Sequence, residues 1–551
     1  MGGPYDFGND RAWDPEGKGN DRGPEQTAAA PISTPTSARP LLLLDTETTA
    51  ANPWKPDREQ WLVMVSLSVV SFMVSLDATI LVAVLPSIAE SLHASAAQAF
   101  WIGTSYLLVS AVCQPVIASV SQHLGRQQLL IASIVSFAFG TVFCALAHDV
   151  AVMLIGRCVQ GLGGGGVVTL TQVVFSDLVP LRERPKYFSV VLGSWAIGSI
   201  VGPVVGGALV ERASWRWCFH INFPFCVISI VATCVFIRSG RASAAPLAKK
   251  LGQVDWVGAV LFVGGLTSFL VGLSWGGVQH PWTSPATKAP VAAGMVGVAL
   301  FLGWQVYRGK NSLLPLTLFR GVSSVAAFYG ALVNGLVLYT ALYYVPIYSM
   351  AVQGSSPMRA GIDLLPAVFF LVPGSVVAAI LTSRFGRFRW AIWCGWGVTM
   401  LASGLFHLLD SRTSFVVFAV VLALFGAGNG MVLTGVNAAT QAIASPADRA
   451  MAAGVYSFMR SLGMAIGVAL SGTVFQNAMA GALAESGLSA SIARDSERYI
   501  AVLQTMEQTD ATRSAILGAY TKGFHAVSTA MAAFSAGALV FSLFIRSHSM
   551  E

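Results

Sequence analysis

Long apolar runs separated by short polar segments occupy most of the chain after residue 60. Each of fourteen runs is long enough to cross about 30 Å of hydrocarbon as a helix. The pattern therefore predicts an all-α polytopic membrane protein with fourteen transmembrane helices. Their expected limits are 61–85, 98–120, 128–147, 150–175, 187–210, 219–237, 255–274, 289–307, 324–347, 361–382, 388–408, 414–436, 452–477 and 521–545.

The composition excludes a soluble domain and gives no sign of a nucleic-acid partner. The 551 residues are 54% hydrophobic and only 11% charged, whereas soluble domains carry about 25% charged residues. The net charge of +7 comes largely from basic residues in short loops, where they orient helices. The seven cysteines lie in or beside apolar runs without metal-ligand spacing. We expect them to be small core residues rather than disulfides or a metal site.

Loop charges predict the orientation in the membrane. Loops on the side of the N-terminal tail carry 15 Lys and Arg, and the short loops opposite carry 5. This bias places both termini in the cytosol. The polar segment 478–520 then lies outside, and its part Ser491–Gln508 is expected to form a helix on the membrane surface.

An internal repeat divides the chain into two halves. At an offset of 265 residues, Gly161–Gly165 matches Gly426–Gly430, and Arg184 falls on Arg449. At the same offset Gly198 and Gly202 fall on later glycines, and at 261 the segment 121–126 matches 382–387. Two homologous six-helix bundles in parallel orientation follow, with a substrate site expected between them near the midplane.

The expected organisation is therefore two bundles joined by two extra helices. Residues 1–58 are rich in Gly, Pro, Ser, Thr and charge, which predicts a disordered cytosolic tail. The remaining parts are an N-terminal six-helix bundle (59–238), a linker with helices 7 and 8 (239–320), C-terminal bundle helices 9–13 (321–477), an extracellular loop (478–520), and helix 14 with a cytosolic tail (521–551).

A glycine-rich stretch in the fifth run is expected to organise the first bundle. Gly198, Gly202 and Gly206 are four residues apart and line one helix face, which lets another helix approach closely. Pro203 removes a backbone donor and is expected to bend the helix. A generic small-residue packing face and a functional motif both fit this pattern.

Further motifs support the second interpretation. They are Leu76-Asp77-Ala-Thr79, Arg157-Cys-Val-Gln160-Gly161 and Trp215-Arg216-Trp217 followed by Asn222-x-Pro224. With the glycine stretch they resemble the fungal branch of the drug:proton antiporter family with fourteen helices, within the major facilitator superfamily, over about residues 60–545. The resemblance implies the major facilitator fold and an antiporter motif made of Gly193, Gly198, Gly202, Pro203, Gly206 and Gly207.

The resemblance also implies a cytoplasmic gate, with one departure. The gate residues are expected to be Gly125, Arg126, Arg182, Arg184, Gly386 and Arg387. The family carries an acidic residue in the loop after the second helix, but this chain has Gln122 there. The usual charge latch of the gate is therefore in doubt.

Two charges inside the spans are candidates for proton coupling. Asp77 lies about 13 Å below the outer end of the first helix, and Arg157 lies about 10 Å below the same face in the fourth. Arg157 maps onto Leu422 in the second half, so the charge is not duplicated. A structural ion pair is the alternative. The resemblance implies that Asp77 and Arg157 handle the proton, with Gln160 as a polar neighbour.

Uncharged side chains are the candidates for a substrate cavity. Aromatic and amide groups suit a bulky, weakly polar organic molecule, although ordinary packing also accounts for any one of them. Arg460 has two interpretations: it snorkels to the interface, or it attracts an acidic substrate. The cavity candidates are Trp195, Asn334, Tyr339, Tyr343, Asn429 and Asn437.

These features predict a proton-coupled exporter of hydrophobic or amphipathic small molecules, of the kind that the resemblance associates with fungal metabolites, toxins or drugs. Gly163–Gly166 is not a nucleotide-binding loop, because no Gly-Lys-Ser/Thr follows it and no strand precedes it. Signals of soluble enzyme chemistry are absent, so we expect no enzyme activity and no cofactor beyond the proton gradient. A monomer in the plasma membrane is expected, with a vacuolar or vesicle membrane as alternative. The rival functions are vacuolar basic amino acid or siderophore transport, and a non-transporting membrane sensor.

Overall fold

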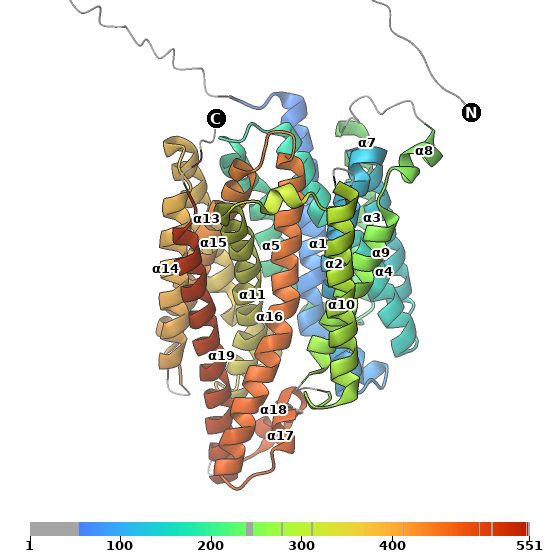
Figure 1. Ribbon diagram of the computed structural model, residues 1–551. Helices are drawn as coiled ribbons and strands as arrows, with labels where there is room; N and C mark the ends of the chain where they lie inside the picture. Colours follow the sequence, from blue (N-terminus) through green and yellow to red (C-terminus); the bar gives the residue numbers. More distant parts are fainter. Residues whose placement is uncertain are drawn as a thin grey trace, which may run out of the picture. The chain divides into compact units, whose positions relative to one another are not determined.

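A computed structural model describes residues 54–237, 246–276, 279–309, 312–410, 413–494, 496–507, 511–546 and 548. Fourteen helices in these ranges are long and apolar enough to cross a membrane, and the ranges contain no β-strand. The long helices run side by side (Figure 1). The all-α, fourteen-span prediction is confirmed, while the expected tail lies outside the described residues as far as residue 53.

The first half contains six spans. Its first helix begins at Arg58, earlier than expected, because Asp57 and Gln60 form a reciprocal capping box. The preceding Trp54 packs edge-on against Tyr187, so residues 54–58 do not belong to the tail. The helices are α1 (Arg58–Ser91), α2 (Ala96–Leu124), α3 (Arg126–Ala145), α4 (Val150–Leu178), α5 (Arg184–Arg212), and α6 (Trp217–His220) with α7 (Asn222–Phe236), which form one span.

The linker between the halves is held together by a buried carboxylate. Asp255 caps α9 through Gly258 N at 3.0 Å, and it accepts from Trp304 Nε1 at 2.8 Å and Leu313 N at 3.2 Å. It is only 3% exposed. These bonds join the linker helices to the segment that leads into the second half. The linker elements are α8 (Leu247–Gly252), α9 (Trp256–Trp275), α10 (Pro285–Arg308) and the 3-10 turn η2 (Leu316–Phe319).

The second half repeats the plan of the first. The helix pair α1 and α5 corresponds to α11 and α16, the pair α3 and α4 to α14 and α15, and each pair is in contact. The expected repeat therefore extends to the packing. The elements are α11 (Val322–Ala351), α12 (Pro357–Asp363), α13 (Leu365–Phe385), α14 (Arg389–Leu405), η3 (Phe406–Leu408), α15 (Phe415–Ile443), α16 (Arg449–Glu485), α17 (Ser491–Arg494), α18 (Ser496–Thr505) and α19 (Ala511–Leu543).

The loop expected at 478–520 is shorter than its apolar limits suggest. Helix α16 continues to Glu485 and α19 begins at Ala511, since the flanking residues are mostly good helix formers. The expected surface helix exists as α17 and α18, at the opposite end of the helices from α8 (Figure 1). Ile500 and Leu503 are buried in the core, and Gln504 Nε2 donates to Met350 O at 3.1 Å. The segment therefore packs on the protein through this side, and its place on the membrane surface stays a prediction.

The glycine face of α5 packs directly on α1. A Cβ at Gly198 would lie 2.8 Å from Phe72 O, one at Gly202 would lie 3.0 Å from Ile80 N, and one at Gly206 would lie 2.9 Å from Ile80 O. Cβ atoms at Gly193 and Gly207 would meet nothing within 4 Å. The expected close approach is therefore confirmed for the three spaced glycines but not for the other two.

The two halves meet along symmetric helix pairs, α2 with α16 and α5 with α13. We call the end with the expected gate residues the cytosolic end, and the end with α18 the outer end. At the cytosolic end a Cβ at Gly454 would lie 3.1 Å from Ala118 Cβ. At the outer end a Cβ at Gly361 would lie 3.2 Å from Pro203 Cβ. The halves thus touch on both sides of the midplane.

Candidate functional site

Asp77 and Arg157 form an ion pair inside the first half. Arg157 Nη1 lies 3.1 Å from Asp77 Oδ2, and each side chain is 1% exposed. The similar depths expected for the two charges in α1 and α4 bring them into direct contact. Removing one partner of such a buried pair would leave a charge uncompensated, which is costly.

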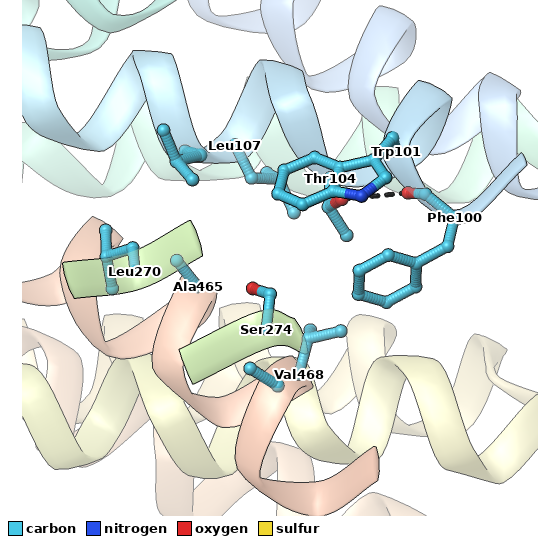
Figure 2. Close-up of a pocket in the computed structure, with 10 residues that line it drawn as sticks. Phe100, Trp101, Thr104, Leu107, Leu270, Ser274, Ala465 and Val468 are labelled. Carbon is cyan, nitrogen blue, oxygen red and sulfur yellow. Dashed lines mark hydrogen bonds between the residues drawn. The ribbon is translucent and has the colours of Figure 1, made fainter. Parts of the chain in front are cut away.

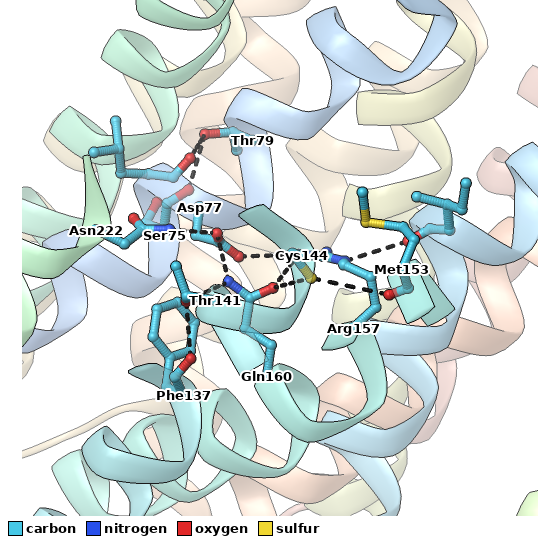
Figure 3. A network of polar contacts seen from close by, with 12 residues as sticks. Ser75, Asp77, Thr79, Phe137, Thr141, Cys144, Met153, Arg157, Gln160 and Asn222 are labelled. Atoms are coloured by element: carbon cyan, nitrogen blue, oxygen red, sulfur yellow. Dashed lines mark hydrogen bonds and ion pairs between the residues drawn. The ribbon is translucent and has the colours of Figure 1, made fainter. Parts of the chain in front are cut away.

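Amide side chains complete the surroundings of the Asp77 carboxylate (Figure 3). Its Oδ1 accepts from Gln160 Nε2 at 2.8 Å and from Asn222 Nδ2 at 2.7 Å. Gln160 also accepts from Arg157 Nη1 at 2.7 Å through Oε1, and donates to Thr141 Oγ1 at 3.1 Å. Four helices, α1, α3, α4 and α7, therefore share one polar network in the first half.

The guanidinium of Arg157 is fixed on its other side as well. Its Nε donates to Ile102 O at 3.3 Å, and its Cζ lies 4.5 Å from the centroid of the Tyr106 ring. Helix α2, which carries both Ile102 and Tyr106, thereby joins the network.

Asn222 and Tyr106 belong to the network but are absent from the residues expected to couple protons. The position of Asn222, two residues before Pro224 at the start of α7, is a signal that the sequence carries. Tyr106 carries no such signal, because an aromatic residue in a transmembrane helix is usually packing. Only the helix arrangement places its ring under the guanidinium.

Two opposing effects act on the buried Asp77 carboxylate, because burial disfavours its charged form and hydrogen-bond donors favour it. Three side-chain donors, from Arg157, Gln160 and Asn222, point at its two oxygens, and donors of this kind favour the charged form. Uptake of a proton requires that some of these donors move away. The site is therefore sensitive to any motion of α1 relative to α4 and α7.

The expected cavity residues do not all gather in one place. Trp195 faces the second half, where Arg460 Cζ lies 5.7 Å from its ring centroid. Tyr339 lies on α11 one turn after Gly335, whose backbone packs against the Arg460 carbonyl. Arg460 therefore does not snorkel to the interface. Asn334 Nδ2 donates to Asn429 Oδ1 at 3.2 Å, so these two amides bind each other.

The remaining two candidates contact other partners. The ring of Tyr343 packs edge-on against that of Tyr344, with centroids 5.3 Å apart. Asn437 Oδ1 accepts from Gln441 Nε2 at 2.7 Å, and both side chains line a pocket beside Arg184 at the cytosolic end. Asn437 is thus placed with the gate.

A small pocket lies at the seam where the linker helix α9 meets both halves. Figure 2 shows Trp101 and Thr104 of α2 facing Ser274 of α9 and Val468 of α16. Thr104 Oγ1 donates to Phe100 O at 2.8 Å, which leaves the walls largely apolar. The other lining residues are Leu107, Leu108, Leu270, Ala465 and Ala469.

An ion pair forms at the gate although the loop lacks its acid. Arg126 Nε lies 3.1 Å from Asp177 Oδ2, and its Nη1 donates to Ser121 Oγ at 2.5 Å. Both partners belong to the first half, in α3 and α4, so a charge latch of the gate stays a prediction. Gly125 has a φ of 103°, which only glycine adopts easily, and this allows the turn from α2 into α3.

Two arginines of the gate reach across to the second half. Arg184 Nη1 donates to Gln441 Oε1 at 2.7 Å, and Arg182 Nε donates to Ser383 O at 3.3 Å. In the repeat, Gly386 has a φ of 65° at the end of α13, while Arg387 is exposed. Both loops therefore turn at a glycine with a positive φ, but the ψ angles of 143° and 18° differ, and so do the contacts of the two loops.

Among the described residues, no three His, Cys, Asp or Glu side chains are grouped so that they could hold a metal ion. The cysteines described there are free thiols.

Comparisons with known proteins agree with the fold. A sequence profile of the Major Facilitator Superfamily matches residues 67–468. The chain is 37% identical to "MFS transporter L2" of Phoma sp., over 88% of this chain and 82% of the relative. It is 32% identical to "MFS-type efflux pump LUC4" of Fusarium sp., over 89% and 88% of the two chains, and 34% identical to "Efflux pump FUS6" of Gibberella fujikuroi, over 77% of each.

Solved structures resemble the fold at low sequence identity. The human organic anion transporter MFSD10 matches with a TM-score of 0.57 and 15% identity, over 89% of this chain and all of that one. A bacterial homologue of the human lysosomal transporter Spinster, in its inward-facing and unoccupied conformation, matches with a TM-score of 0.54 and 17% sequence identity. The match covers 89% of this chain and 98% of that one. These likenesses concern the fold alone. With the profile match and the sequence relatives, they place this multi-pass membrane protein in the major facilitator superfamily.

Proposed function

We propose that this protein is a proton-coupled antiporter that exports hydrophobic or amphipathic small organic molecules from the cytosol. The relatives named as efflux pumps in Fusarium and Gibberella support the direction of transport. A plasma-membrane location, a monomer, the proton gradient as sole energy source and the absence of enzyme activity belong to the same proposal.

The observation that carries the proposal is the buried carboxylate of Asp77 in the first half. It is held by donors on α4 and α7, and its partner Arg157 corresponds to a leucine in the second half. A purely architectural need of the fold would be expected in both halves. An ionisable group inside a membrane bundle is a functional candidate by default.

In the proposed cycle, motion between the halves changes the distance from Asp77 to its donors. Close to Arg157 the carboxylate releases its proton, and apart from it, in apolar surroundings, it takes one up. Protonation thereby favours one of the two states, and a substrate that binds one state better is moved.

The rival transport roles fit the site less well. A basic amino acid needs carboxylates near the substrate site, and the described helices α11, α13 and α15 carry none. A sensor that does not transport would tolerate loss of the Asp77 charge.

The test uses Asp77→Asn, which keeps the shape but cannot titrate. Inside-out plasma-membrane vesicles with an acidified lumen are given a panel of neutral and anionic fluorescent amphiphiles, and accumulation is measured. We expect the wild type to accumulate at least one compound in response to the pH difference. The variant should lose this accumulation while binding the same compound within about three-fold.

Full pH-driven accumulation by Asp77→Asn would reduce the pair to a structural clamp. Absence of any pH-driven flux in the wild type would contradict the antiporter itself. Enrichment of the protein in vacuolar rather than plasma-membrane vesicles would correct the location.

A further inference from the structure

Arg460 in α16 is a central cation that the proton network does not use. It lies eleven residues after Arg449, about 16 Å along the helix. Its Nε and Nη2 are buried and have no hydrogen-bond partner in the part of the chain that the structure describes. Buried donors without an acceptor are costly, so this guanidinium is set up to receive one.

No acidic side chain of the described helices α11, α13, α15 and α16 is placed to pair with it. Within α11, α13, α15 and α16 the sole acid is Glu485, which binds Lys522 at 2.6 Å at the outer end. In the first half, Asp77 is already bound to Arg157. The acceptor that Arg460 lacks is therefore not supplied by these helices.

The internal repeat locates Arg460 at the centre of the molecule. Residues 195 and 460 are separated by 265 positions, the same offset that relates Gly202 to Gly467. Trp195 and Arg460 are thus equivalent positions of the two halves, and they face each other across the seam. The two halves are related by a pseudo-twofold axis, and equivalent residues of the two halves lie close together only if both are near that axis.

A second equivalent pair supports this placement. Ser176 and Gln441, also 265 residues apart, both accept a hydrogen bond from Arg184 at the cytosolic end. The axis therefore passes near both pairs, and in transporters with parallel repeats the substrate lies at the repeat interface near the midplane. Of the two pairs, Trp195 and Arg460 lie deeper in the bundle.

The surroundings of Arg460 are aromatic. Besides the Trp195 ring, Tyr456 lies one turn before Arg460 on α16. Tyr339 lies one turn after Gly335 of α11, whose backbone packs against the Arg460 carbonyl. Aromatic rings beside a single guanidinium suit a flat, conjugated molecule that carries one anionic group.

Building on the exporter function proposed above, we propose that Arg460 and Trp195 form the substrate anchor for organic acids. A carboxylate or enolate of the substrate accepts hydrogen bonds from Nε and Nη2 of Arg460. The conjugated body of the substrate lies against Trp195, on the opposite half. Because the anchor spans both halves, an anion bound there contacts both moving parts of the transporter.

The test compares an acid with its neutral isostere on the full-length protein in lipid nanodiscs. The probes are 1-pyrenebutyrate and 1-pyrenebutyramide at pH 7.5, and binding is measured by fluorescence anisotropy. We expect the wild type to bind the acid at least about tenfold more tightly than the amide, since bonds to a charged group are strong. Arg460→Gln should abolish this preference, while Arg460→Lys should retain part of it.

Arg320→Gln, in an exposed loop position, is the matched control for loss of one positive charge and should keep the full preference. Equal affinity of the wild type for the two probes, including no measurable binding of either, would overturn the anchor. An equal loss of affinity for the acid and the amide in Arg460→Gln would also overturn the anchor. If that variant does not fold, the wild-type comparison and Arg460→Lys still decide.

Binding in nanodiscs requires no proton gradient, so the two proposals fail separately. An intact preference for the acid without pH-driven flux would overturn the antiporter but keep the anchor. Proton-driven export of neutral compounds, with no preference for the acid in binding, would overturn the anchor but keep the antiporter.

Discussion

At the scale of single residues, the candidate proton site depends on side chains that each contact several partners. The Asp77 carboxylate accepts from Arg157, Gln160 and Asn222. Arg157 donates to that carboxylate, to Gln160 and to the carbonyl of Ile102, and also covers the Tyr106 ring. A planar fork with several donors is needed for this combination.

Arg157→Lys is therefore expected to fail although it keeps the charge. One ammonium group cannot reach Asp77, Gln160 and the Ile102 carbonyl together, and it lacks the plane that lies over Tyr106. We expect pH-driven accumulation in vesicles to fall by at least tenfold. The same change at Arg216, which covers Trp215 and donates to Ala147 O at 2.9 Å, is the control and should retain most transport. Equal effects at the two positions would argue against a special role of the fork.

At the scale of helices, close packing and buried polar caps hold the elements in register. The spaced glycines of α5 let its backbone approach α1, and Ser75 of α1 and Ser199 of α5 share a hydrogen bond at 2.7 Å. The helix that carries Asp77 is thereby tied to the helix that carries Trp195. Changes in this contact are expected to affect both sites.

Gly202→Leu is predicted to abolish transport while the protein still inserts. Any Cβ there meets the backbone nitrogen of Ile80 at 3.0 Å and the Thr79 hydroxyl, and overpacking costs about 1–3 kcal/mol. Gly207→Leu, on the same helix but with nothing within 4 Å of its Cβ, is the control and should transport normally. Transport and membrane yield are measured for both. Normal transport by Gly202→Leu would show that this contact is not required.

Asp255→Ala is predicted to loosen the linker helices. It removes the acceptor of Trp304 Nε1 and of the Leu313 amide, and each buried donor left unpaired costs about 1–3 kcal/mol. Thermal unfolding of the purified protein should therefore occur at a clearly lower temperature. Asp149→Ala, which removes the exposed cap of Val152 N in α4, should lower it less. Equal shifts would mean that Asp255 acts only as a helix cap.

At the scale of the whole molecule, the two halves are in contact at both ends, and transport requires one end to open at a time. The cytosolic contacts combine a close approach of α2 to α16 at Gly454 with the bonds from Arg182 and Arg184. The outer contact involves Pro203 and Gly361. Opening at the cytosolic end must separate the first set.

A disulfide across that end should therefore stop the cycle. In Ala118→Cys with Gly454→Cys, the Cβ atoms are 3.1 Å apart before adjustment, close to the range of about 3.5–4.5 Å found in disulfides. Oxidation should abolish transport in vesicles, and a reductant should restore it. The two single variants show whether native cysteines contribute. Undiminished transport with the cross-link verified by mass spectrometry would contradict alternating opening at this seam.

The sequence by itself determined the features that follow from counting residues along the chain. Apolar length gave the fourteen spans, and the constant offset of 265 residues gave two parallel bundles. Helical rise alone predicted that Asp77 and Arg157 lie at similar depth. The spacing of Gly198, Gly202 and Gly206 predicted a contact face, because glycines four apart share one side of a helix.

Only the tertiary structure decided which faces turn toward each other. Asn222 donates a hydrogen bond to Asp77, 145 residues away in the sequence. Asp177 forms an ion pair with Arg126, and Arg460 packs against the Trp195 ring rather than at the membrane–water interface. Such contacts depend on the rotation and tilt of separate helices, which hydrophobic periodicity does not encode. Depth in the membrane follows from counting residues, whereas the neighbour at that depth follows from packing.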